Sequence, residues 1–583
     1  MVARYLVAPH GGRRAHPDIA SALAAAARRG RAALIEIAPG RYEEHLTVRG
    51  EVQLVAAGGA GTVEVVQPRG GVLDAGGAVR VHGLVLAGRD ADVVRCHAGT
   101  LTLEHTEVRA PGGVAVHAMP GTTVTLRDGV FRHGRVLLAG AGGLVERCRF
   151  GDAADNALAA IEGAHVTVLG SRFENSRIHG IRVSGARAHV TGCVLTGTGR
   201  AALMADAQAE LTVADCVIDA AHGEGIAYIE QSGGSVDRTR VTGCEHGIAV
   251  VSGSDPVVRG CAFLDCRDTG INVGAGGRGR FEDCEVVGAG NVAVFVFGGG
   301  APEVHGCRIT RGNVGIAVSG ARGRFAGIRV ADLTSVALRA YDGGKAVFED
   351  VRVERCPTHL ETRGDGGTTA DVQGALFRDF SLSAVEALGQ SRVTLRQVTA
   401  ERGTVGFGSC EESQLFVYDC EVKAAGTSGA LAMGKGRLVA RNLTVTGSEA
   451  LGLLAQDSAR LDVADSEFVD CATAGAGFLG TAAGRFADCA VTGTRGVAVV
   501  GNGLVDVVNL RTSLRVIERP AEPERPPTVV HQYHGPVIHG PVSQAQFAWG
   551  NENVTQNQRT HTPAQTETST QAETSTSEDG NPA

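Results

Sequence analysis

The sequence predicts an all-β protein built as a solenoid of about 19 coils, with 22 or 23 residues in each coil. Three observations support this prediction. One residue slot recurs 19 times between residues 84 and 489, at a mean interval of about 22.5 residues. The segments between slots are short, rich in β-branched residues and alternately apolar, which is typical of strands. Glycine separates these segments and makes up 83 of the 583 residues.

The slot follows an apolar residue by three positions and precedes another apolar residue by two. Cysteine fills it at Cys148, Cys193, Cys216, Cys261, Cys284, Cys307, Cys420 and Cys489. A second column, five residues later, holds Cys244, Cys266, Cys356 and Cys471. Small thiols suit a tightly stacked interior. Metal sites need closely spaced ligands that converge tetrahedrally, so we expect buried thiols and no metal site.

A third feature follows each slot by eight to ten residues: Gly or Ala, an apolar residue, any residue, and another apolar residue. Examples are Gly180-Ile-Arg-Val183, Gly247-Ile-Ala-Val250 and Gly315-Ile-Ala-Val318. Two or three short strands joined by turns make one coil of this length. Stacked coils place equivalent residues at the strand spacing of ~4.8 Å, so the predicted rod is on the order of 90 Å long.

This pattern resembles the right-handed parallel β-helix repeat of the pectin-lyase-like superfamily, over residues 32–517. The resemblance implies the fold, but one fold hosts many activities. Known β-helix enzymes act on acidic polysaccharides. The Asn-Thr-Asp, Asp-Asp, Gly-His-Gly and Arg-Ile-Lys motifs of polygalacturonase-like hydrolases are absent from the sequence, as are the pectin methylesterase segments. No acid-rich group suited to calcium repeats across neighbouring coils.

The leading interpretation is therefore a non-enzymatic intracellular scaffold or ligand-recognition rod, without a cofactor. The alternative is a carbohydrate-active lyase or hydrolase with an atypical site on the surface of the β-helix.

The two ends of the chain differ from the repeat. Residues 1–31 form a predicted cap whose Ala-rich segment, residues 17–28, reads as a helix that covers the open end of the solenoid. Residues 518–528 are rich in proline and predict an extended linker. Residues 559–583 are rich in Thr, Ser, Gln and Glu and predict a disordered tail.

Residues 529–558 are rich in Gly, Asn and Gln, interleaved with β-forming residues. The segments Val537-Ile-His-Gly540, Gln544-Ala-Gln-Phe547 and Trp549-Gly-Asn-Glu-Asn553 resemble bacterial amyloid-signalling motifs similar to the RIP homotypic interaction motif. The resemblance implies self-association or capture of a protein partner. The residues expected to mediate it are Ile538, Gly540, Gln546, Phe547, Trp549 and Asn551. Docking of this segment on the chain's own β-helix, or simple disorder, are the alternatives.

A line of polar residues precedes the Gly-Ile segments, and stacking would align it along one edge of the rod. We call it the polar edge; its residues are Arg177, His179, His222, Glu224, Glu245, His246, Arg267 and Asp268, continued by Asn291 and Asn313. Such residues can bind a polar or anionic polymer or transfer protons, but turns that face water are polar anyway. Phe295 is predicted to face outwards as a sugar platform, and Tyr228 to face the core.

Charge and hydropathy restrict the possible partners. The net charge is −8 and no basic stripe occurs, so we expect no nucleic-acid partner. The longest strongly apolar stretch near the start, residues 19–27, is much shorter than the ~18 residues needed to cross a membrane. No signal peptide is recognisable. The expectation is a cytoplasmic protein with reduced cysteines and a possible polysaccharide or other polymer ligand.

Overall fold

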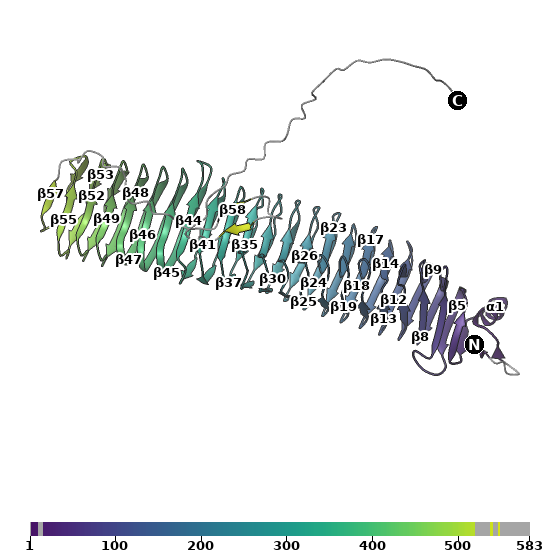
Figure 1. The fold of residues 1–583 in the computed structure, drawn as a ribbon. Coiled ribbons are helices and arrows are strands. Elements are labelled where there is room, and N and C mark those ends of the chain that lie inside the picture. Colours follow the sequence, from purple (N-terminus) through teal and green to yellow (C-terminus); the bar gives the residue numbers. More distant parts are fainter. Residues whose placement is uncertain (1, 10–14, 519–536, 540–545, 549–583) are drawn as a thin grey trace, which may run out of the picture. The chain divides into compact units, whose positions relative to one another are not determined.

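The structure, a computed structural model, describes residues 2–9, 15–518, 537–539 and 546–548. The chain divides into two compact units, residues 1–526 and residues 527–583. The first unit is a rod of stacked parallel coils (Figure 1). The predicted all-β solenoid is confirmed, with about 21 turns rather than 19. The slot motif underestimates the number because the coils at the two ends of the rod lack it.

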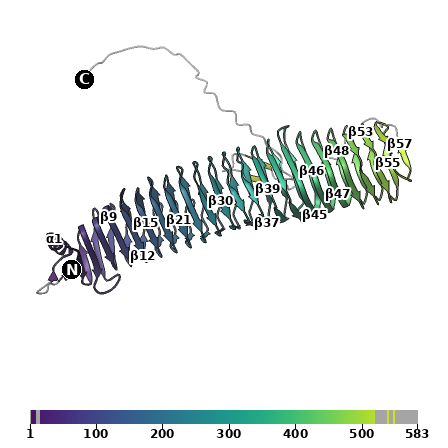
Figure 2. The ribbon, with the colours of Figure 1, turned by 180° about the vertical axis from the view of Figure 1, so that it is seen from behind.

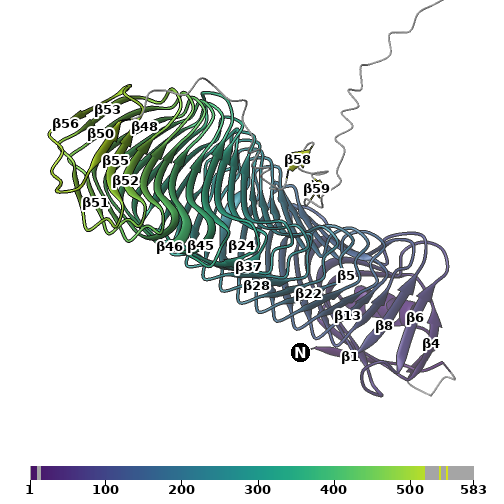
Figure 3. The same ribbon diagram turned by 60° about the vertical axis from the view of Figure 1, so that its left-hand side comes forward.

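Each coil contributes one strand to each of three parallel sheets, as one coil illustrates. In this coil β24 (Glu210–Ala214) lies in sheet 2, β25 (Val217–Asp219) in sheet 3 and β26 (Glu224–Tyr228) in sheet 1. Every strand pairs in parallel with its equivalent in the next coil, so the coils stack in register along the rod (Figures 2 and 3).

Sheet 1 is formed by the Gly-Ile segments and carries the candidate site. Its central strands are β20 (Ile181–Ser184), β23 (Leu203–Asp206), β26, β29 (His246–Val250), β32 (Thr269–Val273), β35 (Val292–Phe297), β38 (Val314–Ser319), β41 (Val336–Tyr341) and β44 (Thr358–Arg363). Further along, the strands run through the corners without a break and span more than one sheet. These are β45 (Thr369–Ala387), β46 (Arg392–Ser409), β47 (Gln414–Ala432) and β48 (Arg437–Thr446).

The backbone conformation at the corner between sheets 2 and 3 explains which residue types precede the slot. That residue takes a left-handed backbone conformation in successive coils, for example Asp215 (φ 54°) and Asp283 (φ 51°). Asp, Asn and Gly tolerate this conformation best. Where arginine stands at this corner, it forms an ion pair with an aspartate of the preceding coil, as Arg238 Nε does with Asp215 Oδ1 at 2.8 Å. The corners therefore both turn the chain and join adjacent coils.

The interior consists of columns of apolar side chains, in which like residues stack in short runs. The rings of Phe150 and Phe173 stack with centroids 4.5 Å apart and an interplanar angle of 7°. All fourteen cysteines are free, and all but Cys410 are buried, which confirms the predicted thiol columns. In one column the Cys193 N–H donates to Cys216 Sγ at 3.4 Å. Burial raises the pKa of the Cys148 thiol to about 11, so this thiol stays protonated and packs as an apolar group.

The predicted N-terminal helix is confirmed as α1 (Ile19–Arg29). The Asp18 side chain accepts a hydrogen bond from the Ser21 N–H at 2.7 Å and caps the helix. The Glu44 carboxylate accepts from the first helical N–H groups, at 3.0 Å and 2.8 Å. Two strands were not predicted within the cap. β1 (Ala3–Val7) pairs in parallel with β3 (Ala33–Ile37) and extends the stack, and the short β2 (Ala15–His16) pairs in parallel with β1.

In the second unit, β58 (Val537–His539) and β59 (Gln546–Ala548) pair antiparallel, with Ile538 opposite Phe547. Gln546 lies on the same short ladder. The other residues predicted to mediate assembly, Gly540, Trp549 and Asn551, lie outside the described residues. So do the predicted tail and all but the first residue of the predicted linker.

Candidate ligand-binding face

The outward side chains of sheet 1 form one continuous column. Strand pairing places them in register on consecutive strands from β26 to β45, so neighbours are one strand spacing of ~4.8 Å apart. We call this column the candidate face; its residues are Ala227, Ala249, Asn272, Phe295, Ala317, Arg339, Glu361 and Glu386.

The middle of the candidate face is apolar and aromatic. Phe295 points away from the core, as predicted, because its neighbours Val294 and Val296 belong to the core cluster and Phe295 does not. Its side chain is nevertheless only 5% exposed. The Phe297 ring stacks beside it, with centroids 5.2 Å apart and an interplanar angle of 17°. Together with the small side chain of Ala317, which lies opposite Phe295, the two rings form an apolar stretch of the candidate face.

Charged groups form one end of the candidate face. Arg339 Nε lies 3.0 Å from Glu361 Oε1, and the second contact of the pair, from the guanidinium to Oε2, measures 3.3 Å. Glu386 follows in register on β45 and is 4% exposed. Sequence analysis did not identify these three residues. The sequence does contain a signal for them, because each stands at the outward position of its coil that is equivalent to Phe295.

Three polar atoms on or beside the candidate face are buried and have no hydrogen-bond partner within the described part of the chain. They are Asn272 Oδ1, His246 Nδ1 and Asn313 Nδ2. His246 Nδ1 lies 3.5 Å from Asp268 Oδ2 but outside hydrogen-bond geometry. A buried polar atom without a partner costs about 1–3 kcal/mol. These atoms therefore favour a ligand that supplies hydrogen bonds.

The structure brings part of the polar edge together. Glu224 and His246 are opposite each other on β26 and β29. Asp268 follows in the next coil, where its carboxylate accepts a hydrogen bond from Asn291 Nδ2 at 2.9 Å. The Asp268 N–H also donates to the Glu245 carbonyl at 3.0 Å, so these residues stack coil on coil. This row borders the candidate face.

The arginines of the polar edge bind the backbone. Arg267 donates through Nη2 to the carbonyls of Ala221 (3.1 Å) and His222 (2.8 Å), which belong to an earlier coil. Arg177 Nε donates to the Ala154 carbonyl at 2.9 Å. These guanidinium groups hold neighbouring coils together.

Two histidines of the polar edge also face the backbone. His222 Nδ1 lies 3.1 Å from the Thr198 carbonyl, and His179 Nδ1 lies 3.2 Å from the Ala201 carbonyl. Burial lowers the pKa of His179 below its usual value, which favours the neutral ring. Tyr228 faces the core as predicted, and its hydroxyl donates to the Leu211 carbonyl at 2.7 Å.

Within the described ranges, no group of three or more His, Cys, Asp or Glu side chains is arranged to hold a metal ion. Among the same residues, no helix combines the length and apolarity required to cross a membrane.

The fold places the protein in the class of parallel β-helices, and the sequence agrees. The family model "Right handed beta helix region" matches residues 78–218, 161–309 and 359–510. The chain therefore belongs to the right-handed β-helix family. No curated protein sequence matches it.

Several solved structures are similar to the chain. PfbA, a surface adhesin of Streptococcus pneumoniae, is 9% identical, with 54% of this chain and 87% of PfbA covered and a TM-score of 0.29. The alginate lyase AlyGC is 10% identical, with 88% and 100% covered and a TM-score of 0.23. The A-module of the Azotobacter vinelandii mannuronan C-5 epimerase AlgE6 is 13% identical, with 77% and 93% covered and a TM-score of 0.19. At these identities the similarity concerns the fold alone.

Proposed function

We propose that the protein is a polysaccharide-recognition rod that binds an extended sugar chain along the candidate face. The observation that carries the proposal is Phe295, an outward aromatic ring that is only 5% exposed and lies one strand from the unpartnered Asn272 carbonyl oxygen. Ligand sites are mostly apolar, with a few polar groups that fix orientation. The apolar face of a sugar ring can stack on the rings of Phe295 and Phe297, and the sugar hydroxyls can form hydrogen bonds with the Asn272 amide.

The neighbouring polar row supplies further hydrogen bonds. A sugar hydroxyl both donates and accepts, so it can donate to Asn272 Oδ1 or bond to His246 Nδ1 in either tautomer. Asp268 accepts from hydroxyls along the same border. Because the coils repeat at the strand spacing, a linear polymer lying along the rod meets one such group after another.

The test is binding of the full chain to a panel of neutral and acidic polysaccharides. Phe295→Ala is expected to weaken binding about tenfold, the loss typical of a central aromatic contact. Phe416→Ala is the matched control, because Phe416 also faces outwards but lies on sheet 2, away from the candidate face. Equal binding by the wild type and Phe295→Ala would contradict the proposal.

A second candidate function is cleavage of the bound chain. It is favoured by one observation, the register of Glu361 and Glu386 on adjacent strands beside Arg339. Glycoside hydrolysis uses two carboxyl groups, one of which protonates the leaving oxygen while the other activates water or attacks the sugar. The Arg339 guanidinium holds the Glu361 carboxylate in a two-point ion pair. Glu386, buried at 4% exposure, is then the candidate acid.

Cleavage is tested by measuring new reducing ends, and unsaturated products for a lyase, in the binding panel. Glu361→Gln and Glu386→Gln are each expected to reduce turnover at least about a hundredfold while binding remains. Turnover that survives both substitutions would exclude this pair. Binding without turnover would leave the protein as a recognition rod.

We further propose that residues 529–558 capture a protein partner or associate with a second copy. Support comes from the resemblance to assembly motifs and from strand formation at 537–539 and 546–548. Phe547→Asp in the full chain is expected to abolish association measured by sedimentation. Unchanged sedimentation of that variant, in a wild type that does associate, would contradict this role for Phe547.

A further inference from the structure

Three arginines form an unbroken column on the outside of sheet 3. Arg308 lies on β37 (Arg308–Gly312), Arg329 on β40 (Arg329–Leu333) and Arg352 on β43 (Arg352–Glu354). Strand pairing places them directly opposite one another, Arg308 against Arg329 and Arg329 against Arg352. All three are exposed. We call them the arginine ladder.

No carboxylate of the described residues lies within 4.0 Å of any guanidinium nitrogen of the ladder. The neighbouring corner in the same coils is arranged differently. There Asp332, Arg355, Asp379 and Arg402 alternate in sign from coil to coil, with Nε–Oδ1 distances of 2.6 Å for Arg355–Asp332 and 2.7 Å for Arg402–Asp379. Like charges directly opposite on neighbouring strands destabilise a sheet. The ladder therefore has a cost to folding that the neighbouring corner avoids.

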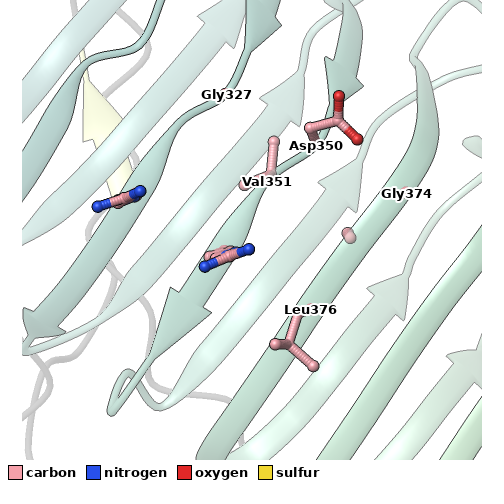
Figure 4. A pocket seen from close by; sticks show the side chains of 8 residues that line it. Gly327, Asp350, Val351, Gly374 and Leu376 are labelled. Atoms are coloured by element: carbon pink, nitrogen blue, oxygen red, sulfur yellow. The ribbon is translucent and has the colours of Figure 1, made fainter.

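A depression with a volume of about 420 Å³ lies beside the ladder (Figure 4). Arg329 and Arg352 line it, together with Gly327, Asp350 and Gly374. Gly327 and Gly374 occupy corner positions, where several other coils carry Asp, Asn or Arg side chains. Because these two corners have no side chain, the surface beside the guanidinium groups stays open.

We propose that the arginine ladder is a second binding site, which takes the oxyanions of a linear acidic glycan. Guanidinium groups bind carboxylate and sulfate in a planar, two-point geometry. The three cations repeat at ~4.8 Å along the rod, so one glycan chain lying along the rod contacts all of them in turn. The site is on a different sheet from the candidate face and goes beyond the function proposed above.

A glycan fits the surroundings better than a nucleic acid does. No aromatic residue lines the depression, whereas single-stranded nucleic acids are bound by stacking their bases on aromatic rings. Glu354 lies two residues from Arg352 on the same outward face, and Asp350 borders the depression. These carboxylates accept hydrogen bonds from sugar hydroxyls, which a DNA phosphate backbone lacks, and Thr310, two residues from Arg308, offers a further hydroxyl to a sugar.

The experiment uses the full chain and measures binding to polygalacturonate (carboxylate), dextran sulfate (sulfate), uncharged dextran and duplex DNA across a series of salt concentrations. The ladder variant replaces Arg308, Arg329 and Arg352 with Gln. A matched control replaces Arg187, Arg238 and Arg402, which removes the same charge from exposed arginines that are paired with carboxylates.

Binding to one or both acidic glycans that falls at least about tenfold in the ladder variant, with little change in the control, supports the proposal. The glycan whose binding falls more in the ladder variant identifies the oxyanion that the site prefers. The salt dependence of binding should also weaken in the ladder variant, because fewer counterions are released. Equal binding by ladder variant and wild type, equal loss in the control, or tighter binding to duplex DNA than to either glycan would each overturn it. Circular dichroism of both variants confirms that the rod is folded.

Discussion

Arg339 and Glu361 form a two-point ion pair across neighbouring strands, with Nε 3.0 Å from Oε1 and a second contact of 3.3 Å. The two side chains are 6% and 17% exposed, although both point away from the core. Glu386 stands next in register. A pair with so little access to water keeps its strength in salt better than the exposed pairs at the corners. It also fixes the position of the Glu361 carboxylate beside Glu386.

Removing one partner of this pair leaves a charge that water barely reaches. Arg339→Met is therefore expected to lower the free energy of unfolding by about 3 kcal/mol. The double variant with Glu361→Gln should recover much of that loss, because no uncompensated charge remains. Urea unfolding of the wild type, both single variants and the double variant measures the coupling. Additive losses would show that the two side chains act independently.

His359 predicts a stability change in acid. Its ring is fully buried between Phe377 and Phe380, and burial lowers its pKa to about 3. In the unfolded chain the pKa is about 6.5. The unfolded state therefore binds the extra proton between these values, so stability is complete above pH ~6.5 and falls as the pH drops towards 3.

His359→Leu should flatten this pH dependence and raise the melting temperature at pH 5. Neither ring nitrogen has a hydrogen-bond partner among the described residues, so an apolar side chain loses no polar contact. His165→Asn is the control, because His165 is exposed on β18 (His165–Leu169). An unchanged pH profile in His359→Leu would contradict the assignment.

The thiol columns predict a simple reactivity pattern. Native protein at pH 7.5 should show no rapidly reacting thiol, because thirteen of the fourteen cysteines are buried and burial raises the pKa of the remaining one, Cys410, to about 12. Denaturation should release all fourteen. Titration with a coloured disulfide reagent, before and after guanidinium, counts them. Fewer than fourteen thiols after denaturation without a reductant would reveal disulfide bonds.

The arginine ladder predicts that a surface substitution stabilises the rod. Arg329→Gln removes the middle cation and both like-charge contacts, so the free energy of unfolding should rise by about 0.2–1 kcal/mol in low salt. The gain should vanish at 1 M salt, where screening is strong. Arg402→Gln should shift stability in the opposite direction, because it breaks a bond to Asp379. Denaturant midpoints at two salt concentrations decide between these outcomes.

The architecture was readable from the sequence because stacking repeats one local pattern. A single period predicted the sheets, the buried cysteines and the outward direction of Phe295. The coils before residue 84 were missed in the count because they lack the slot motif. Their strands are longer instead, as in β5 (Leu46–Ala56), and pair through their own apolar alternation.

The site was only partly readable, for a physical reason. Arg267 reaches backbone carbonyls 45 and 46 residues away, and sequence position alone does not show where so long a side chain ends. Arg339, Glu361 and Glu386 were missed for a different reason. The polar edge was predicted from polar residues in the turns, whereas these charges stand on the strands, in the column of small and aromatic residues that contains Phe295.

In the middle of the rod, each coil pairs only with the coil before it and the coil after it. Length is therefore an independent property of this molecule, and one whole period can be removed without changing how the remaining coils meet. A deletion of residues 217–239, which joins two equivalent positions, shortens the rod by about one strand spacing of ~4.8 Å. The number of repeats thus works as a ruler, which sets how far apart the two ends of the rod are held.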